Sequence, residues 1–382
     1  MAFIGVQPAS IPLTSSDITD GIINSSKLDL TDDYSFTGTI TGAGQSLRPH
    51  HRPIIINGDM QVAQRGTSKS SHNAVSYTTV DRFKTVCETG TYTVTQENLS
   101  SGNAYLNGFK HALRLDCTTA EASAGSAGEQ TTVEQRIEGF NLLPFFKGTS
   151  NAQPYTLAFW VKASKTGSNL QVNLRDNDNS RQVGGTYSIS SANTWEKKVI
   201  NYPADTTGAF DNNADASLTI EWFLDGGSNY SGGAVDTTWG ANDNTDRNVT
   251  NFDLAGSTDN DWAVTGVQLE VGTYTSSTIP SFQFETYQEN LSRCQRYFEI
   301  CEGGKYFWNA SSHEAKVNVE YRQVKRGTPT LTNISTNENC ANGIQYGVNA
   351  IDNTLGATVN AVNAFVTGEK FFYGKFSADA EI

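Results

Sequence analysis

Two aromatic residues lie in a stretch of sequence with little else to bury. Tyr230 and Trp239 fall within residues 225–261, a long segment rich in Gly, Ser, Asn and Asp. A loop of this length is often functional, and sugar-binding sites place a flat aromatic ring beside amide and carboxylate groups. We therefore predict that Tyr230 and Trp239 contact a ligand. Packing against the domain or against a neighbouring subunit is an equal alternative.

The tryptophans outside this segment stand in apolar, strand-like surroundings. Trp160 and Trp222 are flanked by Phe159 and Val161 and by Phe223 and Leu224, so both sides of their strands are expected to be covered. Trp195 stands in a similar pattern. These tryptophans are predicted to serve the core, and the aromatic residues of 225–261 to serve binding.

Closely spaced Asp and Asn residues provide the oxygen ligands that calcium takes. Such clusters occur at residues 176–180, 243–246 and 259–261, and none has the glycine at the sixth position that an EF-hand loop needs. An ordinary Asx-rich turn is the commoner reason for such a cluster. The sequence still allows one calcium ion between Asp59 and Asp261, which are expected at the first and last strands of one domain.

Residue patterns for catalysis are missing from the sequence. No Gly-x-Ser-x-Gly motif stands in a strand–turn–helix context, and the five histidines are scattered without a His-Glu-x-x-His motif. A glycosidase needs two carboxylates beside a cleft, but 40 acidic residues create many accidental pairs. We predict a protein that is not an enzyme. The sequence allows calcium as a cofactor and indicates no other.

The composition is that of an acidic β-protein. Thr, Ser, Asn and Gly are abundant, hydrophobic residues make up 37%, and the net charge is −13. An acidic surface repels nucleic acid and anionic lipid, and no apolar run approaches the 18 residues of a membrane span. No signal-peptide pattern is expected at the start. The five cysteines form no C-x-x-C pair and predict buried free thiols: Cys87, Cys117, Cys294, Cys301 and Cys340.

The order of patterns along the chain predicts four parts. Residues 1–50 carry spaced aliphatic side chains that a lone arm would leave in water, so we expect an anchoring arm that associates with other copies. Residues 51–284 predict a jelly-roll or β-sandwich domain, with strand patterns punctuated by Gly, Asn, Asp and Ser. Residues 285–301 predict a connecting helix, and residues 302–382 a small β-domain.

Strands within the predicted sandwich follow from runs of apolar or alternating residues. Leu157–Val161 is apolar throughout and is expected to be a central strand. The predicted strands are Ile54–Ile56, Tyr92–Thr95, Ala112–Leu115, Thr132–Ile137, Tyr155–Lys162, Leu170–Leu174, Trp195–Tyr202, Ser217–Leu224 and Asp261–Val271. A further strand is predicted at residues 34–42 of the arm.

Six segments, in a fixed order, resemble the central domain of bacteriophage tail-fibre and appendage proteins. Together they cover roughly residues 54–300. They are NGDMQVAQRGTS at 57–68, YTTVDRF at 77–83, QRIEG at 135–139, FWVK at 159–162, GVQLEVG at 266–272 and FETYQENLSRCQRYF at 284–298. Residues 1–30 resemble the N-terminal segments of fibre proteins from marine phages.

The resemblance implies a homotrimeric subunit of a virion appendage with a carbohydrate-binding-like jelly-roll body. It implies a glycan of the host surface as ligand, and attachment to phage tail or capsid proteins, which we place at residues 1–50. It leaves open whether the tail or the capsid is the attachment point. Two alternatives stand beside it: a capsid or tail decoration with a structural role alone, and a glycan-degrading tailspike enzyme.

Overall fold

The computed structural model describes residues 41–42, 45–46, 52–121, 126–309, 314–338, 348–352, 356–362 and 368–382. Contacts between Cα atoms group Met1–Pro49 and His50–Ile382 into two units. In the first unit only β1 (Thr41–Gly42) and β2 (Gln45–Ser46) are described. The rest of the predicted arm, most of its strand at 34–42, and Cys340 lie outside the described residues.

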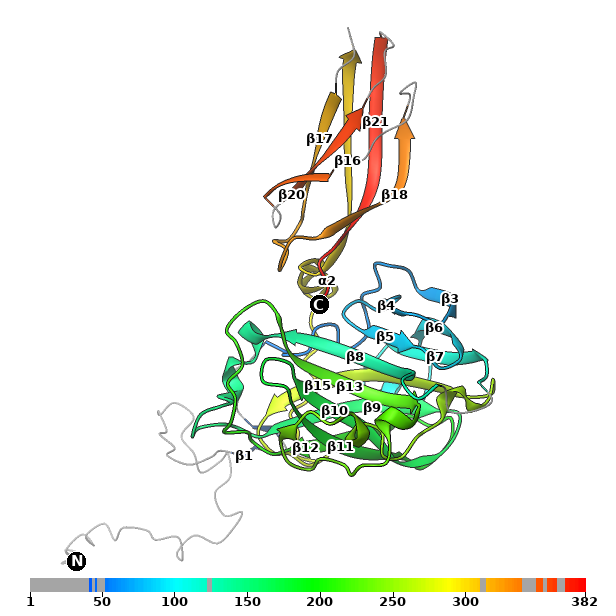
Figure 1. The fold of residues 1–382 in the computed structure, drawn as a ribbon, viewed down its shortest axis with the longest axis vertical. Coiled ribbons are helices and arrows are strands. Elements are labelled where there is room, and N and C mark those ends of the chain that lie inside the picture. Colours follow the sequence, from blue (N-terminus) through cyan, green and yellow to red (C-terminus); the bar gives the residue numbers. More distant parts are fainter. Residues whose placement is uncertain are drawn as a thin grey trace, which may run out of the picture. The chain divides into compact units, whose positions relative to one another are not determined.

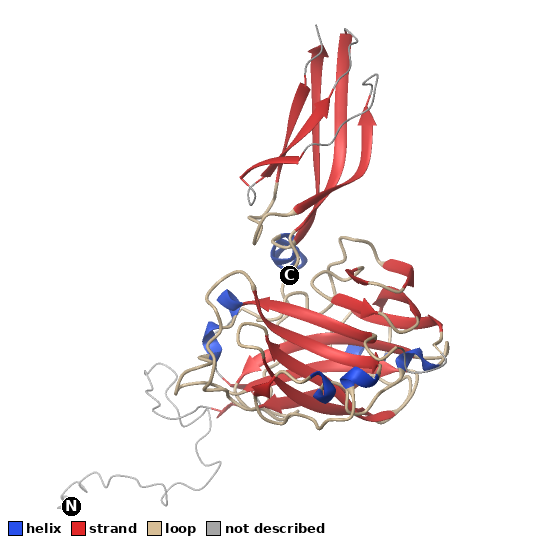
Figure 2. Ribbon diagram, in the orientation of Figure 1, coloured by secondary structure: helices blue, strands red, loops and turns tan. Residues whose placement is uncertain are grey.

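Two antiparallel sheets form the body, which we define as residues 52–297 (Figures 1 and 2). The seven-stranded sheet has the order β14-β11-β10-β13-β8-β5-β4, and the six-stranded sheet β12-β9-β15-β7-β6-β3. The all-β prediction is confirmed, and the body is sandwich-like. The strands of the body are β3 (Ser68–His72), β4 (Val75–Tyr77), β5 (Lys84–Cys87), β6 (Thr91–Asn98), β7 (His111–Thr119), β8 (Gln130–Glu138), β9 (Tyr155–Ala163), β10 (Gly167–Asp176), β11 (Arg181–Ile189), β12 (Glu196–Tyr202), β13 (Ala216–Gly226), β14 (Gly240–Ala241) and β15 (Asp261–Val271).

Alternating side chains along the strands fill the space between the two sheets. In β13, Leu218, Ile220, Trp222 and Leu224 point inward and are fully buried. The Trp222 ring meets that of Phe159 from β9 edge to face, with centroids 5.5 Å apart. This geometry is favourable for aromatic pairs and holds the sheets together across the core.

Most predicted strands are found, with shifts at their ends. β15 has the predicted bounds, Asp261–Val271. β11 was not predicted, because Gly184 and Gly185 interrupt its apolar pattern, although it pairs with β10 along most of its length. The prediction of a strand at Ile54–Ile56 is wrong: these residues form bends, and Ile56 bonds to the side chain of Gln135 instead of to a strand.

Short helical elements connect the strands of the body. Two of them, η1 and η2, follow β8 and bring Phe140, Leu143 and Phe146 to the surface, each about half exposed. The helical elements of the body are α1 (Gly102–Leu106), η1 (Gly139–Asn141), η2 (Leu143–Phe145), η3 (Ser228–Tyr230), η4 (Asn244–Asp246), η5 (Leu254–Gly256) and α2 (Tyr287–Gln295).

Helix α2 is shorter than the predicted 285–301 helix. A capping box starts it: Thr286 and Glu289 satisfy each other's backbone N–H groups. Phe298 falls within the predicted helix, but it begins β16 (Phe298–Asn309), which pairs residue by residue with β21 (Gly368–Asp379). Strand pairing from the far end of the chain therefore overrides the helical spacing.

Two three-stranded sheets follow the body. β16, β21 and β18 (Thr330–Glu338) form one, and the other consists of β17 (Glu314–Glu320), β20 (Gly356–Val362) and β19 (Val348–Asp352). The fully buried guanidinium of Arg82 pairs with Glu381 and lies 3.4 Å from the ring centroid of Tyr297. Residues 50–382 thus group as one contact unit, and no division falls at the predicted boundary before residue 302.

The four cysteines that the structure describes are buried and free: Cys87, Cys117, Cys294 and Cys301. The prediction of buried free thiols is confirmed for these four. Burial raises the pKa of the Cys87 and Cys294 thiols well above the ordinary value, which keeps them unreactive. Among the described helices, none has the length and apolar character to span a membrane.

Candidate functional site

Tyr230 and Trp239, the predicted ligand contacts, are both buried. Trp239 belongs to the main core, where its ring faces that of Tyr155 and its Nε1 donates to the Pro203 carbonyl over 2.9 Å. Tyr230 packs on Phe223 and donates its hydroxyl to a backbone carbonyl. The premise that these rings lack apolar cover is therefore wrong, because residues 225–261 fold back onto the sandwich.

Trp160, which was predicted to lie in the core, lies outside it. Its neighbours Phe159 and Val161 point into the sandwich, so Trp160 points to the opposite face of β9 and stays partly exposed. Trp222 and Trp195 are buried as predicted. Strand alternation, rather than the apolar character of the neighbours, thus decides where each tryptophan lies.

The segment after β13 covers part of the outer face of the seven-stranded sheet. Gln171 and Asn173 on β10 point away from the core, and their side-chain amides donate to the backbone carbonyls of Asp246 and Arg247. The backbone N–H of Val249 donates to the Gln171 side chain in return. Polar strand residues therefore hold the segment in place, and the outer face of β10 and β11 is largely closed there.

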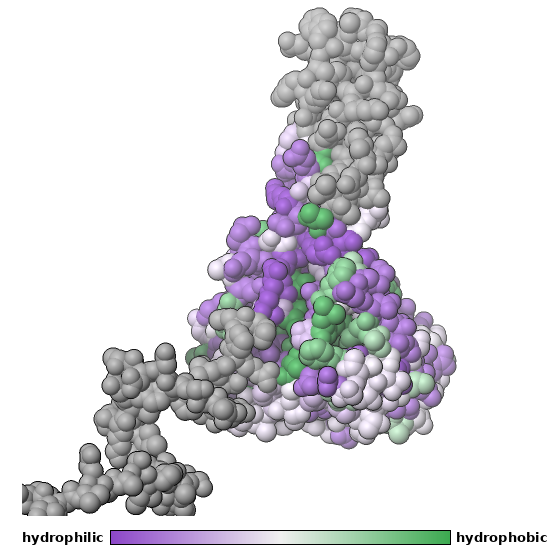
Figure 3. Space-filling view, turned by 90° about the vertical axis from the view of Figure 1, so that its left-hand side faces the viewer, coloured by the Kyte–Doolittle hydropathy of each residue, from purple (hydrophilic) through white to green (hydrophobic). Residues whose placement is uncertain are grey.

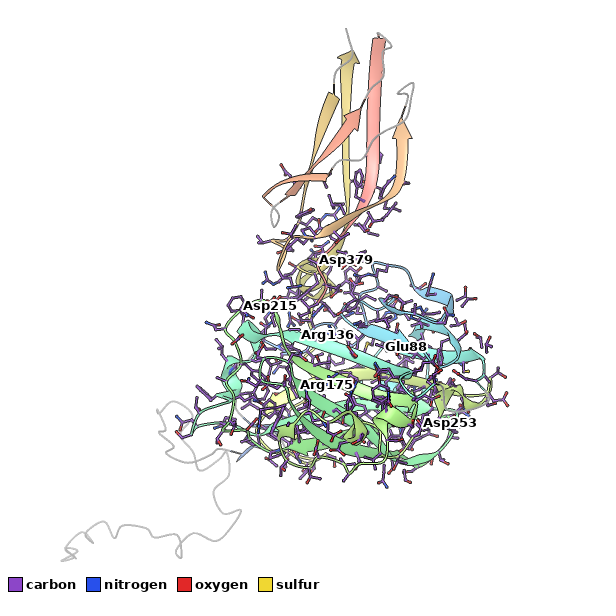
Figure 4. The ribbon with its side chains drawn as sticks, in the orientation of Figure 1. Glu88, Arg136, Arg175, Asp215, Asp253 and Asp379 are labelled. Atoms are coloured by element: carbon purple, nitrogen blue, oxygen red, sulfur yellow. The ribbon has the colours of Figure 1, made fainter. Side chains whose placement is uncertain are left out.

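The rest of this outer face carries a lattice of charged side chains, the charged face, defined as Lys84, Glu134, Arg136, Arg175 and Glu221. They come from the adjacent strands β5, β8, β10 and β13 (Figure 1). The register places Arg175 and Arg136 on either side of Thr219, and Glu221 directly opposite Glu134. Figure 4 labels Arg136 on β8 and Arg175 on β10, with β13 between them.

Cations outnumber carboxylates on the charged face. Arg247 from the covering segment adds a third guanidinium and pairs with Glu221 through two nitrogen atoms. Burial alone would raise the pKa of Glu221, but the Arg247 guanidinium holds it below the ordinary value. Arg136 pairs with Glu134 at 3.1 Å. Four cationic side chains thus surround two carboxylates in a chain whose net charge is −13.

The two arginines beside Thr219 remain open to a ligand. The side chains of Arg136 and Arg175 are 32% and 25% exposed. Arg175 lies 3.5 Å from Glu221, and its Nε atom has no hydrogen-bond partner within the described part of the chain. A guanidinium with an unused donor recognises carboxylate and other oxyanions through paired N–H groups.

Glu221 is unsuited to act as the acid of a glycosidase. A glycosidase acid has a raised pKa, so that it holds a proton near neutral pH. The pKa of Glu221 is instead lowered by its arginine partners, and the group is fully buried. The chemistry that this face offers is charge-assisted hydrogen bonding from a rigid sheet.

The predicted calcium site between Asp59 and Asp261 is not formed. The Val267 N–H of β15 donates to the Gly58 carbonyl, and Asp261 lies six residues earlier on the same strand. That offset separates the two aspartates by roughly 20 Å. Asp261 already faces the Arg114 guanidinium at 2.7 Å, and Asp59 accepts from Asn290. In the described part of the chain, no three His, Cys, Asp or Glu side chains form a metal-binding group.

A lysine satisfies the acidic cluster at residues 176–180. Lys147 and Asp176 are completely buried, with Nζ 2.5 Å from the Asp176 carboxylate and 3.0 Å from that of Asp205. The same ammonium donates to the carbonyls of Thr207 and Gly208. An ammonium therefore occupies the oxygen-rich position for which the sequence suggested a turn or calcium.

Five of the six segments that carry the family resemblance, all but residues 159–162, meet at one buried polar junction. Asn57 donates to the Asp81 carbonyl and lies 3.2 Å from the Asn290 amide, while Gln135 bonds to both backbone groups of Ile56. Gly58 is required there, because a Cβ atom would lie 2.2 Å from the Val267 carbonyl oxygen. These motif residues hold the first and last parts of the body together and do not form a ligand site.

Asp59 at this junction gives the protein a specific pH dependence. Burial raises its pKa to about 6, above the unfolded value of about 3.9. As pH falls, the folded state therefore binds this proton at a higher pH than the unfolded state does. The contribution of Asp59 to stability is present below about pH 4 and is lost as pH rises to about 6. Asp59→Asn removes that contribution, so its unfolding free energy relative to the native protein should rise by about 2 kcal/mol between pH 4 and pH 7.

Urea denaturation at several pH values measures this difference. Because only the change with pH is compared, a constant loss of a hydrogen bond in the variant does not affect the result. The exposed residue Asp259, changed to asparagine in the same way, is the control. A difference between variant and native protein that stays flat from pH 4 to pH 7 contradicts the assignment.

A second surface feature is apolar. Figure 3 shows apolar residues gathered in a band on one face of the body, with hydrophilic residues beside it. Three large apolar side chains on the η1–η2 connection are also about half exposed: Phe140 (48%), Leu143 (54%) and Phe146 (55%). Phe146 has a φ of +50°, an uncommon conformation for a large side chain. Exposed apolar groups of this kind favour contact with another protein surface.

Comparison with known proteins gives distant structural likeness alone. No protein-family model matches the sequence, and no curated protein matches it. Among solved structures, the enzymatically active domain of tailspike protein 4 from bacteriophage CBA120 is 13% identical, with a TM-score of 0.29. The match covers 57% of this chain and 21% of that one. A candidate sugar-binding protein from Bacteroides thetaiotaomicron is 12% identical with a TM-score of 0.29, over 58% of this chain and 100% of that one.

Proposed function

We propose that this chain is a non-enzymatic subunit of a phage appendage and that its body binds a glycan of the host surface. The observation that supports glycan binding is the charged face. There the side chains of Arg136 and Arg175 are partly exposed on rigid strands, while residues 225–261 cover the adjoining surface. Sites on strands hold their side chains more accurately than sites on loops. The ordered series of fibre-like segments over residues 54–300 supports placement in a virus particle.

A binding assay on host cells tests this proposal. The full chain, fluorescently labelled, should bind cells of the host and lose that binding after the cell-surface polysaccharide is removed enzymatically. Binding that survives removal of the polysaccharide would overturn the glycan assignment. A reducing-sugar assay on the same polysaccharide should show no release of product, and a time-dependent release would favour the tailspike alternative.

Immunogold labelling of the particle tests the placement. Label on a tail or capsid appendage is expected, and it distinguishes the two attachment points. If intact particles carry no label, the proposal that this protein is part of the virus particle is wrong.

We propose a homotrimer as the assembly of the chain. The spaced aliphatic residues of 1–50 and the exposed Phe140, Leu143 and Phe146 support association, because each apolar side chain buried is worth roughly 1.5–3 kcal/mol. Light scattering on the purified chain at micromolar concentration should give three times the mass of one chain. Deletion of residues 1–50 should leave a folded protein that no longer joins the particle. A monomeric full-length chain would contradict this prediction.

A further inference from the structure

Arg136 and Arg175 form a paired cationic position in the middle of the charged face. Each is a direct neighbour of Thr219 across a strand boundary, so their Cα atoms lie roughly 10 Å apart on one face. Both side chains point away from the core, because Leu174 and Ile137, their neighbours in sequence, point into it. Two guanidinium groups are thus presented in one direction, from the strands on either side of β13.

The carboxylates present do not use all the donors of these guanidinium groups. Glu221 is already held through two nitrogen atoms of Arg247, and Arg175 reaches it only at 3.5 Å. The buried Nε of Arg175 has no partner within the described residues. Because the Arg175 side chain as a whole is 25% exposed, N–H groups of its guanidinium that no carboxylate holds at short range can donate to an incoming oxyanion.

Charge favours an anionic ligand at this position over a neutral one. Lys84 and Arg247 add to the two arginines, and burial lowers the pKa of Lys84 although Glu134 opposes this. The rest of the chain is acidic, with 40 acidic against 27 basic side chains, so an anion is repelled elsewhere and attracted here. The local excess of cations on this acidic protein therefore favours binding of an anionic ligand at the charged face over binding elsewhere on the surface.

We infer that the charged face binds an acidic glycan, with Arg136 and Arg175 on a carboxylate or sulfate group of the sugar. This inference rests on the proposed function and names its substrate class. The paired N–H groups of a guanidinium match either oxyanion, and the short side chain of Thr219 stands between the two arginines. Attraction of this kind weakens as salt screens it.

Binding of defined oligosaccharides to the full chain tests the inference. The probes are polygalacturonate oligomers, the same oligomers with their carboxylates reduced to alcohols, and a sulfated galactan of similar length. The acidic oligomers, the sulfated ones or both should bind, and the carboxyl-reduced oligomers should bind at least tenfold more weakly than the carboxylate form if that form binds. Equal affinity for the native and reduced oligomers, or no binding of either acidic probe, overturns the inference.

Single substitutions locate the site. Arg175→Gln and Arg136→Gln should each weaken binding of the acidic probe at least tenfold. Arg114→Gln is the matched control, because Arg114 is 28% exposed and paired with carboxylates on the six-stranded sheet; its affinity should stay within twofold. Should a glutamine variant fail to fold, Arg175→Lys keeps the charge, loses the paired donors and should still bind at least threefold more weakly.

The outcomes separate this inference from the proposed function. Wild-type affinity in both arginine variants, or an equal loss in Arg114→Gln, removes the assignment to the charged face. If the protein still binds host cells through polysaccharide in that case, the glycan-binding function stands and only the site and ligand class are wrong. If polysaccharide removal leaves cell binding intact, the proposed function itself fails.

Discussion

Replacing Lys147 by methionine is expected to lower the free energy of unfolding by about 3–5 kcal/mol. The Lys147 ammonium is completely buried and lies within 3.0 Å of two carboxylates, those of Asp176 and Asp205. Without it, the buried Asp176 carboxylate would keep only neutral partners, the backbone N–H groups of Asp178 and Asn179 and the side-chain amide of Asn179. The loss is therefore the cost of an uncompensated buried charge, which exceeds the value of the ion pair itself.

Urea denaturation of the variant measures this loss directly. Lys162→Met is the control, because Lys162 pairs with Glu97 near the surface and should cost no more than about 1 kcal/mol. The double variant Lys147→Met with Asp176→Asn should recover part of the loss, since it removes the stranded charge as well. A Lys147 variant as stable as the Lys162 variant would mean that water or a small cation takes the position of the ammonium.

Trp239→Ala should lower the free energy of unfolding by about 3–5 kcal/mol and act as a core truncation. The ring is 9% exposed, packs beside Tyr155 in the main core and donates from Nε1 to the Pro203 carbonyl. Its removal creates a cavity between residues 225–261 and the sandwich, and leaves a carbonyl without its donor. This reverses the expectation from sequence, which assigned Trp239 to ligand binding.

Trp160→Ala is the matched comparison for Trp239. Because Trp160 lies on the outer face of β9 and is only partly buried, its replacement should cost about 1–2 kcal/mol. Thermal melts of both variants give the order of the two effects. If Trp160→Ala unfolds at the lower temperature, the outer face of the six-stranded sheet contributes more to stability than the packing of residues 225–261.

Strand patterns made much of the fold predictable. β15 and β13 were placed well because their apolar and alternating residues are bounded by Asp and Gly, a pattern that favours a strand. The helix at 285–301 was too long in prediction, since Phe298 satisfies both a helical stripe and a strand, and only pairing with β21 decides between them. β11 was lost to Gly184 and Gly185, where a side chain would meet neighbouring side chains at about 3 Å or less.

The candidate site was less predictable than the fold. Arg136 and Arg175 lie 39 positions apart in sequence and become neighbours of Thr219 only through strand order. One signal was available for Arg136, which lies in the predicted strand Thr132–Ile137 between inward-facing positions. Arg175 lies one residue beyond the predicted strand Leu170–Leu174. The aromatic residues of 225–261 misled for the opposite reason, because composition around a residue does not show where its loop folds back.

The junction between Asn57 and Asn290 also sets when the body can fold. These residues are 233 positions apart, so the ribosome needs roughly 10–50 seconds between them at ordinary rates of synthesis. Until Asn290 emerges, Asn57 lacks one of its partners, and β15, the last strand of the body in the sequence, has only just been synthesised. Residues 1–50 have left the ribosome well before Asn290 does. Residues 1–50 of nascent chains on neighbouring ribosomes of one mRNA can therefore associate before the body of any chain has folded. Assembly of the subunits is then linked to their synthesis.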